Sequence, residues 1–188
     1  DGPFWRARFY VDYYHSGRHE RAWSRDGRFY YVMELLRGID VVFHLAGIAH
    51  RYADAGEYQR VNREAAVHLA TAAVAAGVRC FVFISSVKAM GPAPDGRARG
   101  EIDVSPPATP YGLSKWRAEC ALREQFAEGD MAIVILRPSL VYGTEPKGNL
   151  RLLARGVRMG LPRPPDGGAR SMVALPDLVA LLAELSRH

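Results

Sequence analysis

The feature that most constrains the fold is an alternation of apolar runs and helix-like segments that begins near residue 38. Runs rich in Val, Ile and Phe span residues 40–47, 78–86 and 131–143. Segments with helical periodicity lie between them, at residues 57–77 and 111–128. A continuous apolar run is typical of a parallel strand that is buried on both faces. The alternation therefore predicts an α/β fold, a doubly wound parallel sheet with helices on both faces.

Other parts of the chain carry weaker signals. Residues 1–37 are rich in aromatic residues and arginine, have no clean period and contain no glycine-rich turn, so they are not expected to fit the alternation. Residues 90–109 are rich in Pro and Gly, which predicts a loop. Residues 148–160 predict a short basic helix, and residues 171–188 predict a strand followed by a helix.

Composition excludes several classes of protein. Cys80 and Cys120 are the only cysteines, so neither a disulfide framework nor a cysteine-rich metal site is expected, and no metal is predicted. The net charge is +5, but no run of five like charges exists, which argues against a nucleic-acid partner. No apolar stretch approaches the length of a membrane span, and the first ten residues contain no apolar leader segment. Neither a membrane nor a secretory route is therefore expected, and a reducing cytoplasm fits these features.

Tyr111 and Lys115 carry the first sign of chemistry, because four residues on a helix separate side chains that share one face. An ammonium beside a phenol favours the phenolate, so we expect the pKa of Tyr111 to be lowered enough for proton exchange with a substrate hydroxyl. Ser86 ends the preceding strand, where its hydroxyl is able to orient the same substrate oxygen. The alternative is a packed tyrosine, a solvated lysine and a serine that caps the strand end. The strand–helix–strand setting favours catalysis.

Several stretches between Gly38 and Leu185 resemble the extended short-chain dehydrogenase/reductases of the NAD-dependent epimerase/dehydratase type. In chain order they are DVVFHLAG, VNREAAVHLATAAVAAGVRCFVFISSVKAMG, PYGLSKWRAE, ILRPSLVYG and RSMVALPDLVALL. The resemblance is greatest to UDP-glucose 4-epimerase-like enzymes and UDP-sugar 4-ketoreductases of bacterial polysaccharide biosynthesis. It implies a partial Rossmann-type sheet with the start of a small substrate domain. The expected parts are an atypical N-terminal segment (1–37), a partial NAD(P)-binding domain (38–144) and the start of a substrate-binding region (145–188).

The resemblance also implies roles for single residues. Tyr111 would be the acid/base, Lys115 would bond the nicotinamide ribose and tune Tyr111, and Ser86 would contact the reacting hydroxyl. The residues implied to line the cofactor, besides Tyr111 and Lys115, are Leu45, Ala46, Gly47, Asn62, Ser85 and Pro138. The residues implied to contact the substrate are Lys88, Ser139, Asn149 and Arg170. A helix-start cap remains open for Asn62, and an ordinary surface arginine remains open for Arg170. Leu140 stands where many members carry asparagine, so one substrate contact is expected to be missing.

The implied reaction is hydride transfer at C4 of a UDP-sugar with NAD as cofactor, and NADP stays open. The choice among an epimerase, a ketoreductase and a dehydratase also stays open. The expected binding partner is a nucleotide-sugar substrate, and a homodimer is one option for the oligomeric state. The family opens with G-x-x-G-x-x-G, which binds the cofactor pyrophosphate, and residues 1–46 contain no such motif. We therefore expect a truncated member with impaired cofactor binding. The alternatives are a non-catalytic binding or scaffold protein, and a decayed gene product without function.

Overall fold

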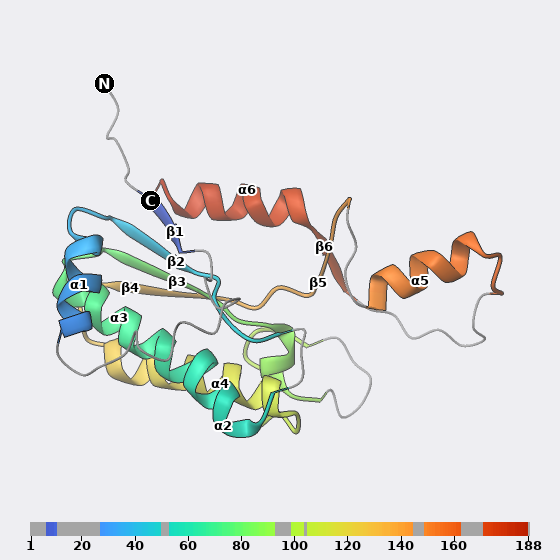
Figure 1. Cartoon of the computed structure of the whole chain (residues 1–188), viewed down its shortest axis with the longest axis horizontal. Coiled ribbons are helices and arrows are strands. Elements are labelled where there is room, and N and C mark those ends of the chain that lie inside the picture. The colour runs from blue at the N-terminus through green and yellow to red at the C-terminus, as the bar shows by residue number, and fades with distance from the viewer. Residues whose placement is uncertain are drawn as a thin grey trace. The chain divides into compact units, whose positions relative to one another are not determined.

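The computed structural model describes most of the chain in two compact units, Asp1–Arg137 and Pro138–His188. The described residues are 7–10, 27–49, 53–92, 99–103, 105–144, 149–162 and 171–187. The first unit contains a parallel sheet and the helices packed on it (Figure 1). Each unit has its own strands and helices, so each is described by itself.

In the part of the first unit that the structure describes, the sheet has four strands in the order β1-β2-β3-β4. They are β1 (Ala7–Tyr10), β2 (Val41–His44), β3 (Cys80–Ile84) and β4 (Ala132–Leu136). All three pairs of neighbours are parallel, with Val41 opposite Cys80 and Cys80 opposite Ala132. The carboxyl ends of the strands therefore meet at one edge of the sheet, which is where ligands bind in folds of this class.

Helical crossovers connect each strand to the next. They are α1 (Gly27–Leu36), then α2 (Ala55–Tyr58), η2 (Gln59–Glu64) and α3 (Ala65–Ala75), and finally α4 (Pro110–Phe126) after the short 3₁₀ helix η3 (Val87–Met90). Because the strand order is sequential and such crossovers are right-handed, the helices fall on the same side of the sheet. Figure 1 shows α1, α3 and α4 side by side on one face. The α/β architecture is confirmed, and coverage of the second face stays a prediction for this unit.

The core of the first unit lies between the sheet and these helices. Leu36 of α1, Leu69 of α3 and Leu122 of α4 pack with Val42, Phe81 and Phe83 of the two central strands. Small alanines on α3 let the helix approach the sheet closely, and Ala66, Ala70 and Ala73 are fully buried. The expected helical stripe and both expected central strands are therefore confirmed.

The expectation that residues 1–37 fall outside the alternation is wrong for the described parts of this segment. β1 pairs with β2 in parallel, and α1 ends in the core at the buried Leu36. A strand of four residues is too short to show a period of its own, and only its pairing with β2 identifies it. Whether residue 37 is a domain boundary stays a prediction.

The expectation of one buried strand over residues 131–143 is wrong in part. β4 ends at Leu136, and Leu140–Tyr142 forms a separate strand, β5, in the second unit. Pro138 has no N–H for a sheet ladder, which explains why the strand stops there. β4 also lies at the end of the described strand order, and its residues are half-buried or exposed rather than buried.

The described residues of the second unit form a two-stranded parallel sheet and two helices. β5 pairs with β6 (Met172–Ala174), with Leu140 opposite Met172. The expected basic helix is α5 (Asn149–Arg158), and the expected strand and helix at the end of the chain are β6 and α6 (Leu175–Leu185). Among the described residues of both units, no helix is long and apolar enough to cross a bilayer. Cys80 and Cys120 are both free, and Cys120 is exposed.

Candidate active site

The first turn of α4 brings Tyr111 to the carboxyl end of β3. Thr109 caps the helix by accepting a hydrogen bond from the Gly112 N–H (3.1 Å), and Pro110 occupies the first turn, as the sequence predicts. A Cβ on Gly112 would lie 2.5 Å from the Lys88 carbonyl oxygen. Gly112 therefore allows α4 to press against η3, which follows β3 directly.

Asn62 links the loop after β2 to α4. Its Oδ1 accepts from the Ile48 N–H (2.7 Å), and its Nδ2 donates to the Ile48 carbonyl (3.1 Å) and to Ser114 Oγ (3.0 Å). The side chain is fully buried in the π-helical segment η2. The alternative of a helix-start cap for Asn62 is wrong, because the helix begins earlier, where Asp54 caps it.

Lys115 is buried at the same edge of the sheet. Its Nζ donates to the Ile84 carbonyl oxygen (2.9 Å) and lies 4.7 Å from the centre of the Phe83 ring. A Cβ on Gly47 would lie 2.9 Å from Asn62 Oδ1 and 3.1 Å from Lys115 Nζ, so only glycine leaves room for both groups. Burial lowers the pKa of Lys115 from 10.5 to about 8, although the nearby Glu119 carboxylate opposes this. The ammonium is therefore present at neutral pH at a free-energy cost.

Tyr111 faces a mixed environment. Its ring packs on the cluster of Ile48, Ala53, Tyr58 and Val61, and the two tyrosine ring centres are 6.1 Å apart. Lys88 Nζ lies 5.8 Å from the centre of the Tyr111 ring, and the Ser86 side chain is near enough to the phenol to lower its pKa. Ser86 Oγ also accepts from the Lys88 N–H (3.2 Å) and so caps η3. The interpretation of Ser86 as a cap after the strand therefore holds, and its contact with a substrate hydroxyl stays a prediction.

The pKa of Tyr111 is raised, so the expectation that Lys115 lowers it is wrong for the ligand-free chain. Burial is the main cause, the Ser86 side chain opposes it, and the neighbouring Tyr58 adds to it. The Lys115 ammonium instead lies against the Ile84 carbonyl and the Phe83 ring. Spacing on a helix indicates a shared face, but it does not give the direction of the two side-chain ends.

His44 is a second buried titratable group beside Lys115. It ends β2, and its ring centre lies 6.0 Å from that of Phe81 and 5.6 Å from that of Phe83. Burial first, and then the Lys115 charge, lower the pKa of His44 to about 3. The imidazole is therefore neutral at physiological pH. Its Nδ1 is buried without a hydrogen-bond partner among the described residues.

Tyr111, Lys115 and Ser86 thus meet where parallel strands end, in a chain whose sequence carries the landmarks noted above. The model of the NAD dependent epimerase/dehydratase family matches residues 21–164. The chain belongs to this family.

Known members of the epimerase/dehydratase family resemble the chain at about one-third identity. A UDP-glucose 4-epimerase of Vibrio cholerae is 36% identical over 165 residues, which are 81% of this chain and 49% of the relative. Among solved structures, MoeE5 in complex with UDP-glucuronic acid and NAD is 32% identical with a TM-score of 0.66, over 81% of this chain and 54% of that one. UDP-glucuronic acid 4-epimerase from Bacillus cereus in complex with NAD is 27% identical with a TM-score of 0.68, over 82% and 52%. The chain therefore spans about half the length of these relatives.

The structure brings most of the predicted site residues in the first unit to one edge of the sheet. Gly47, Asn62, Ser86, Lys88, Tyr111 and Lys115 meet there through the contacts above. Leu45 is exposed directly after β2, and Ala46 is half-buried. Their roles in binding and catalysis stay predictions.

Other predicted residues are not joined to this group. Ser85 is buried and turns its hydroxyl to Glu119. Pro138 and Ser139 belong to the second unit, and Asn149 begins α5 there, although its side chain lies outside the description. Arg170 also lies outside the described residues. The predictions for these residues remain predictions.

Sequence reasoning missed several residues that surround the site in this family member. They are His44, Tyr58, Ser114, Glu119 and Arg137. Two of them carried a readable signal, because His44 and Arg137 are single polar residues within apolar runs. Glu119 follows Lys115 by one helical turn, and this spacing could have raised the question of a buried charge pair.

Proposed function

We propose that this chain forms the acid/base half of an NAD-dependent nucleotide-sugar epimerase/dehydratase-family oxidoreductase that acts at C4 of a UDP-sugar. The observation that carries the proposal is the position of Ser86, Tyr111 and Lys115 at the carboxyl end of β3. Resemblance to the Vibrio cholerae UDP-glucose 4-epimerase and to structures that contain NAD with UDP-sugars supports the choice of cofactor and substrate.

The residues at this edge of the sheet fit the nicotinamide ribose of NAD. An ammonium has three N–H donors, and Lys115 uses one on the Ile84 carbonyl, which leaves donors for the ribose hydroxyls. Leu45 is 44% exposed and offers an apolar surface beside the strand end. When NAD is bound, its nicotinamide supplies the acceptor, and later the donor, of the hydride at C4.

The chain's own residues move and hold the proton. Tyr111 takes the proton of the sugar 4-hydroxyl, and Ser86 orients the same oxygen by a hydrogen bond. Because burial raises the pKa of Tyr111, the positive charge of a bound nicotinamide would supply the bias toward the phenolate. An epimerase returns hydride to the opposite face of the 4-keto sugar, and Tyr111 then returns the proton. A ketoreductase carries out only this second half.

The test is turnover of UDP-glucose, UDP-glucuronic acid and UDP-N-acetylglucosamine with NAD, followed by NMR of the sugar H4 signal. We expect a C4-inverted or 4-keto product from at least one of these sugars. Tyr111→Phe should lower the rate by about 10²- to 10⁴-fold, the usual contribution of a general acid/base. Tyr142→Phe is the matched control, because Tyr142 is an exposed tyrosine of β5, and its rate should stay at the wild-type level.

Two results would overturn the proposal. One is an unchanged rate in Tyr111→Phe. The other is saturable binding of NADH, seen as enhanced cofactor fluorescence, without turnover of any of the three sugars. The second result would favour a non-catalytic binding protein that keeps the family's fold.

A further inference from the structure

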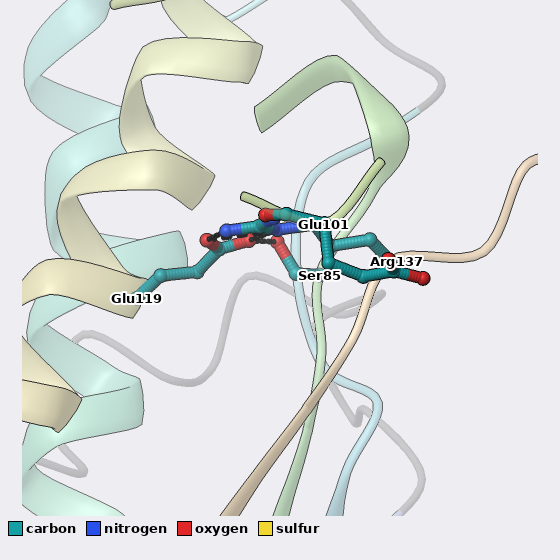
Figure 2. Close-up of polar contacts among 4 residues, drawn as sticks. All are labelled: Ser85, Glu101, Glu119 and Arg137. Carbon is teal, nitrogen blue, oxygen red and sulfur yellow. Dashed lines mark hydrogen bonds and ion pairs between the residues drawn. The ribbon is translucent and has the colours of Figure 1, made fainter. Parts of the chain in front are cut away.

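A buried polar network lies behind the candidate active site, and Figure 2 shows its members. Glu119 is fully buried on α4, and its carboxylate accepts hydrogen bonds from Ser85 Oγ (2.5 Å) and from Arg137 Nε and Nη2 (3.0 Å and 2.6 Å). Arg137 Nη1 donates in turn to the Glu101 carbonyl oxygen (2.8 Å). The Arg137 side chain is 8% exposed. The network therefore joins the end of β3, the middle of α4, the end of β4 and the loop before α4.

The positions of these residues in the chain tie the network to the candidate active site. Ser85 directly precedes Ser86, and Glu119 lies one helical turn beyond Lys115. The Ser85 N–H donates to the Leu136 carbonyl oxygen (2.7 Å), so the ends of β3 and β4 are also joined through the backbone. A shift of any one of these elements would therefore move a residue of the proposed site.

The direction of the Ser86 side chain follows from that of Ser85. Ser86 has extended backbone angles (φ −161°, ψ 150°). Neighbouring side chains on an extended chain point to opposite sides. Because Glu119 holds the Ser85 hydroxyl on one side, the Ser86 hydroxyl is turned to the other, where it caps η3 and lowers the pKa of Tyr111.

Stability alone does not explain an ion pair at this place. Burying two charges costs several kcal/mol, and well-packed apolar residues of similar size usually give equal or greater stability. What a bidentate arginine–carboxylate pair adds is a fixed orientation of the groups that it joins. Orientation is what a site with two hydroxyls on one substrate oxygen requires.

We propose that Ser85, Glu119 and Arg137 are positioning residues that fix the ends of β3 and β4 on α4 and so align Ser86 with Tyr111. This inference rests on the proposed function for its catalytic consequence, and not for its structural one. None of the three side chains needs to touch the substrate. Their effect on the reaction passes through Ser86.

The first experiment separates positioning from stability. Ser85→Ala removes one hydroxyl, and the double variant Glu119→Met/Arg137→Met replaces the ion pair with an apolar pair. We expect both variants to unfold within a few degrees of the wild type and to lose about 10- to 100-fold in kcat, with little change in KM for the UDP-sugar. A wild-type kcat in the folded double variant would overturn the proposal. Arg37→Met is the control, because Arg37 forms an exposed ion pair with Glu34, and its kcat should not change.

The second experiment does not depend on turnover. The ¹³C chemical shift of the Tyr111 ring carbon that bears the hydroxyl, assigned by its loss in Tyr111→Phe, reports the polar surroundings of the phenol, which include the Ser86 side chain. We expect this shift to change in Ser85→Ala and to stay constant in Arg37→Met. If the wild type is inactive but the shift changes, the proposed function fails and the positioning role stands. If the shift does not change in Ser85→Ala, the positioning role is overturned, whatever the activity.

Discussion

Two buried charges, Glu119 and Lys115, lie one turn apart on α4, and they differ in how well neighbouring groups compensate their charge. Glu119 receives hydrogen bonds from Ser85 and Arg137, so its charge is matched by a guanidinium and a hydroxyl. Within the described ranges, Lys115 donates to one carbonyl oxygen and lies over the face of Phe83, and its pKa is lowered to about 8 although the Glu119 charge opposes this. A compensated buried charge is typical of structural support. An under-compensated one is typical of functional sites, which agrees with the role proposed for Lys115.

The largest expected effect on the free energy of unfolding concerns Glu119, the compensated charge. Arg137→Met leaves the Glu119 carboxylate buried without its guanidinium, which should lower the free energy of unfolding by about 3–5 kcal/mol. Urea denaturation at pH 7 measures it. Arg37→Met, which breaks an exposed pair, should cost less than about 1 kcal/mol. Equal losses in the two variants would show that Glu119 is not the buried, compensated charge described here.

For Lys115→Met we expect the free energy of unfolding to rise instead of fall. The folded-state pKa of Lys115, about 8, lies below its usual 10.5, so burial of the ammonium costs stability at every pH below about 8. Removing the charge should therefore raise the free energy of unfolding at pH 7 by up to about 3 kcal/mol. The gain should shrink as the pH rises from about 8 toward 10.5, because the lysine of the wild type then becomes neutral in both states.

Urea denaturation of Lys115→Met at pH 7 and pH 9.5 checks this expectation. Lys88→Met is the matched control, because Lys88 is an exposed lysine of η3 and its replacement should change stability little at either pH. A loss of stability in Lys115→Met at pH 7 would mean that the bond to the Ile84 carbonyl outweighs the cost of burial. The contrast between the two charges on α4 would then disappear.

The fold around these charges could be predicted from the sequence to different degrees. The two central strands and α4 followed from patterns within about twenty residues, with Pro110 opening the helix as expected. β1 could not be predicted, because a strand of four residues is defined by its partner, Val41–His44, and not by its own pattern. β4 and β5 look like one strand in the sequence, because only the tertiary fold separates them.

The chemistry of the site was predictable in its residue types and not in its electrostatics. Ser86, Tyr111 and Lys115 are readable because a known pattern brings them together on a βαβ background. The Glu119–Arg137 pair joins residues that are eighteen positions apart on different elements, and no local pattern signals it. The predicted direction of the Tyr111 pKa shift was wrong. Burial dominates this shift, and burial is a property of the packed chain that no local pattern shows.

The smallest expected effect concerns His44, which shares the environment of Lys115. Its folded-state pKa, about 3, lies below its usual 6.5. The contribution of His44 to the stability of the folded state is therefore fully present above pH 6.5 and is lost as the pH falls toward 3. Between pH 6.5 and pH 5 the free energy of unfolding should fall by about 2 kcal/mol from this group. In His44→Leu this acid slope should be absent. In Lys115→Met the loss of stability should level off at a higher pH than in the wild type, because repulsion from the ammonium is the second cause of the low folded-state pKa. Urea denaturation at a series of pH values from 6.5 down to 3.5 measures both changes. Loss that levels off at the same pH in the wild type and in Lys115→Met would show that the Lys115 charge does not act on His44.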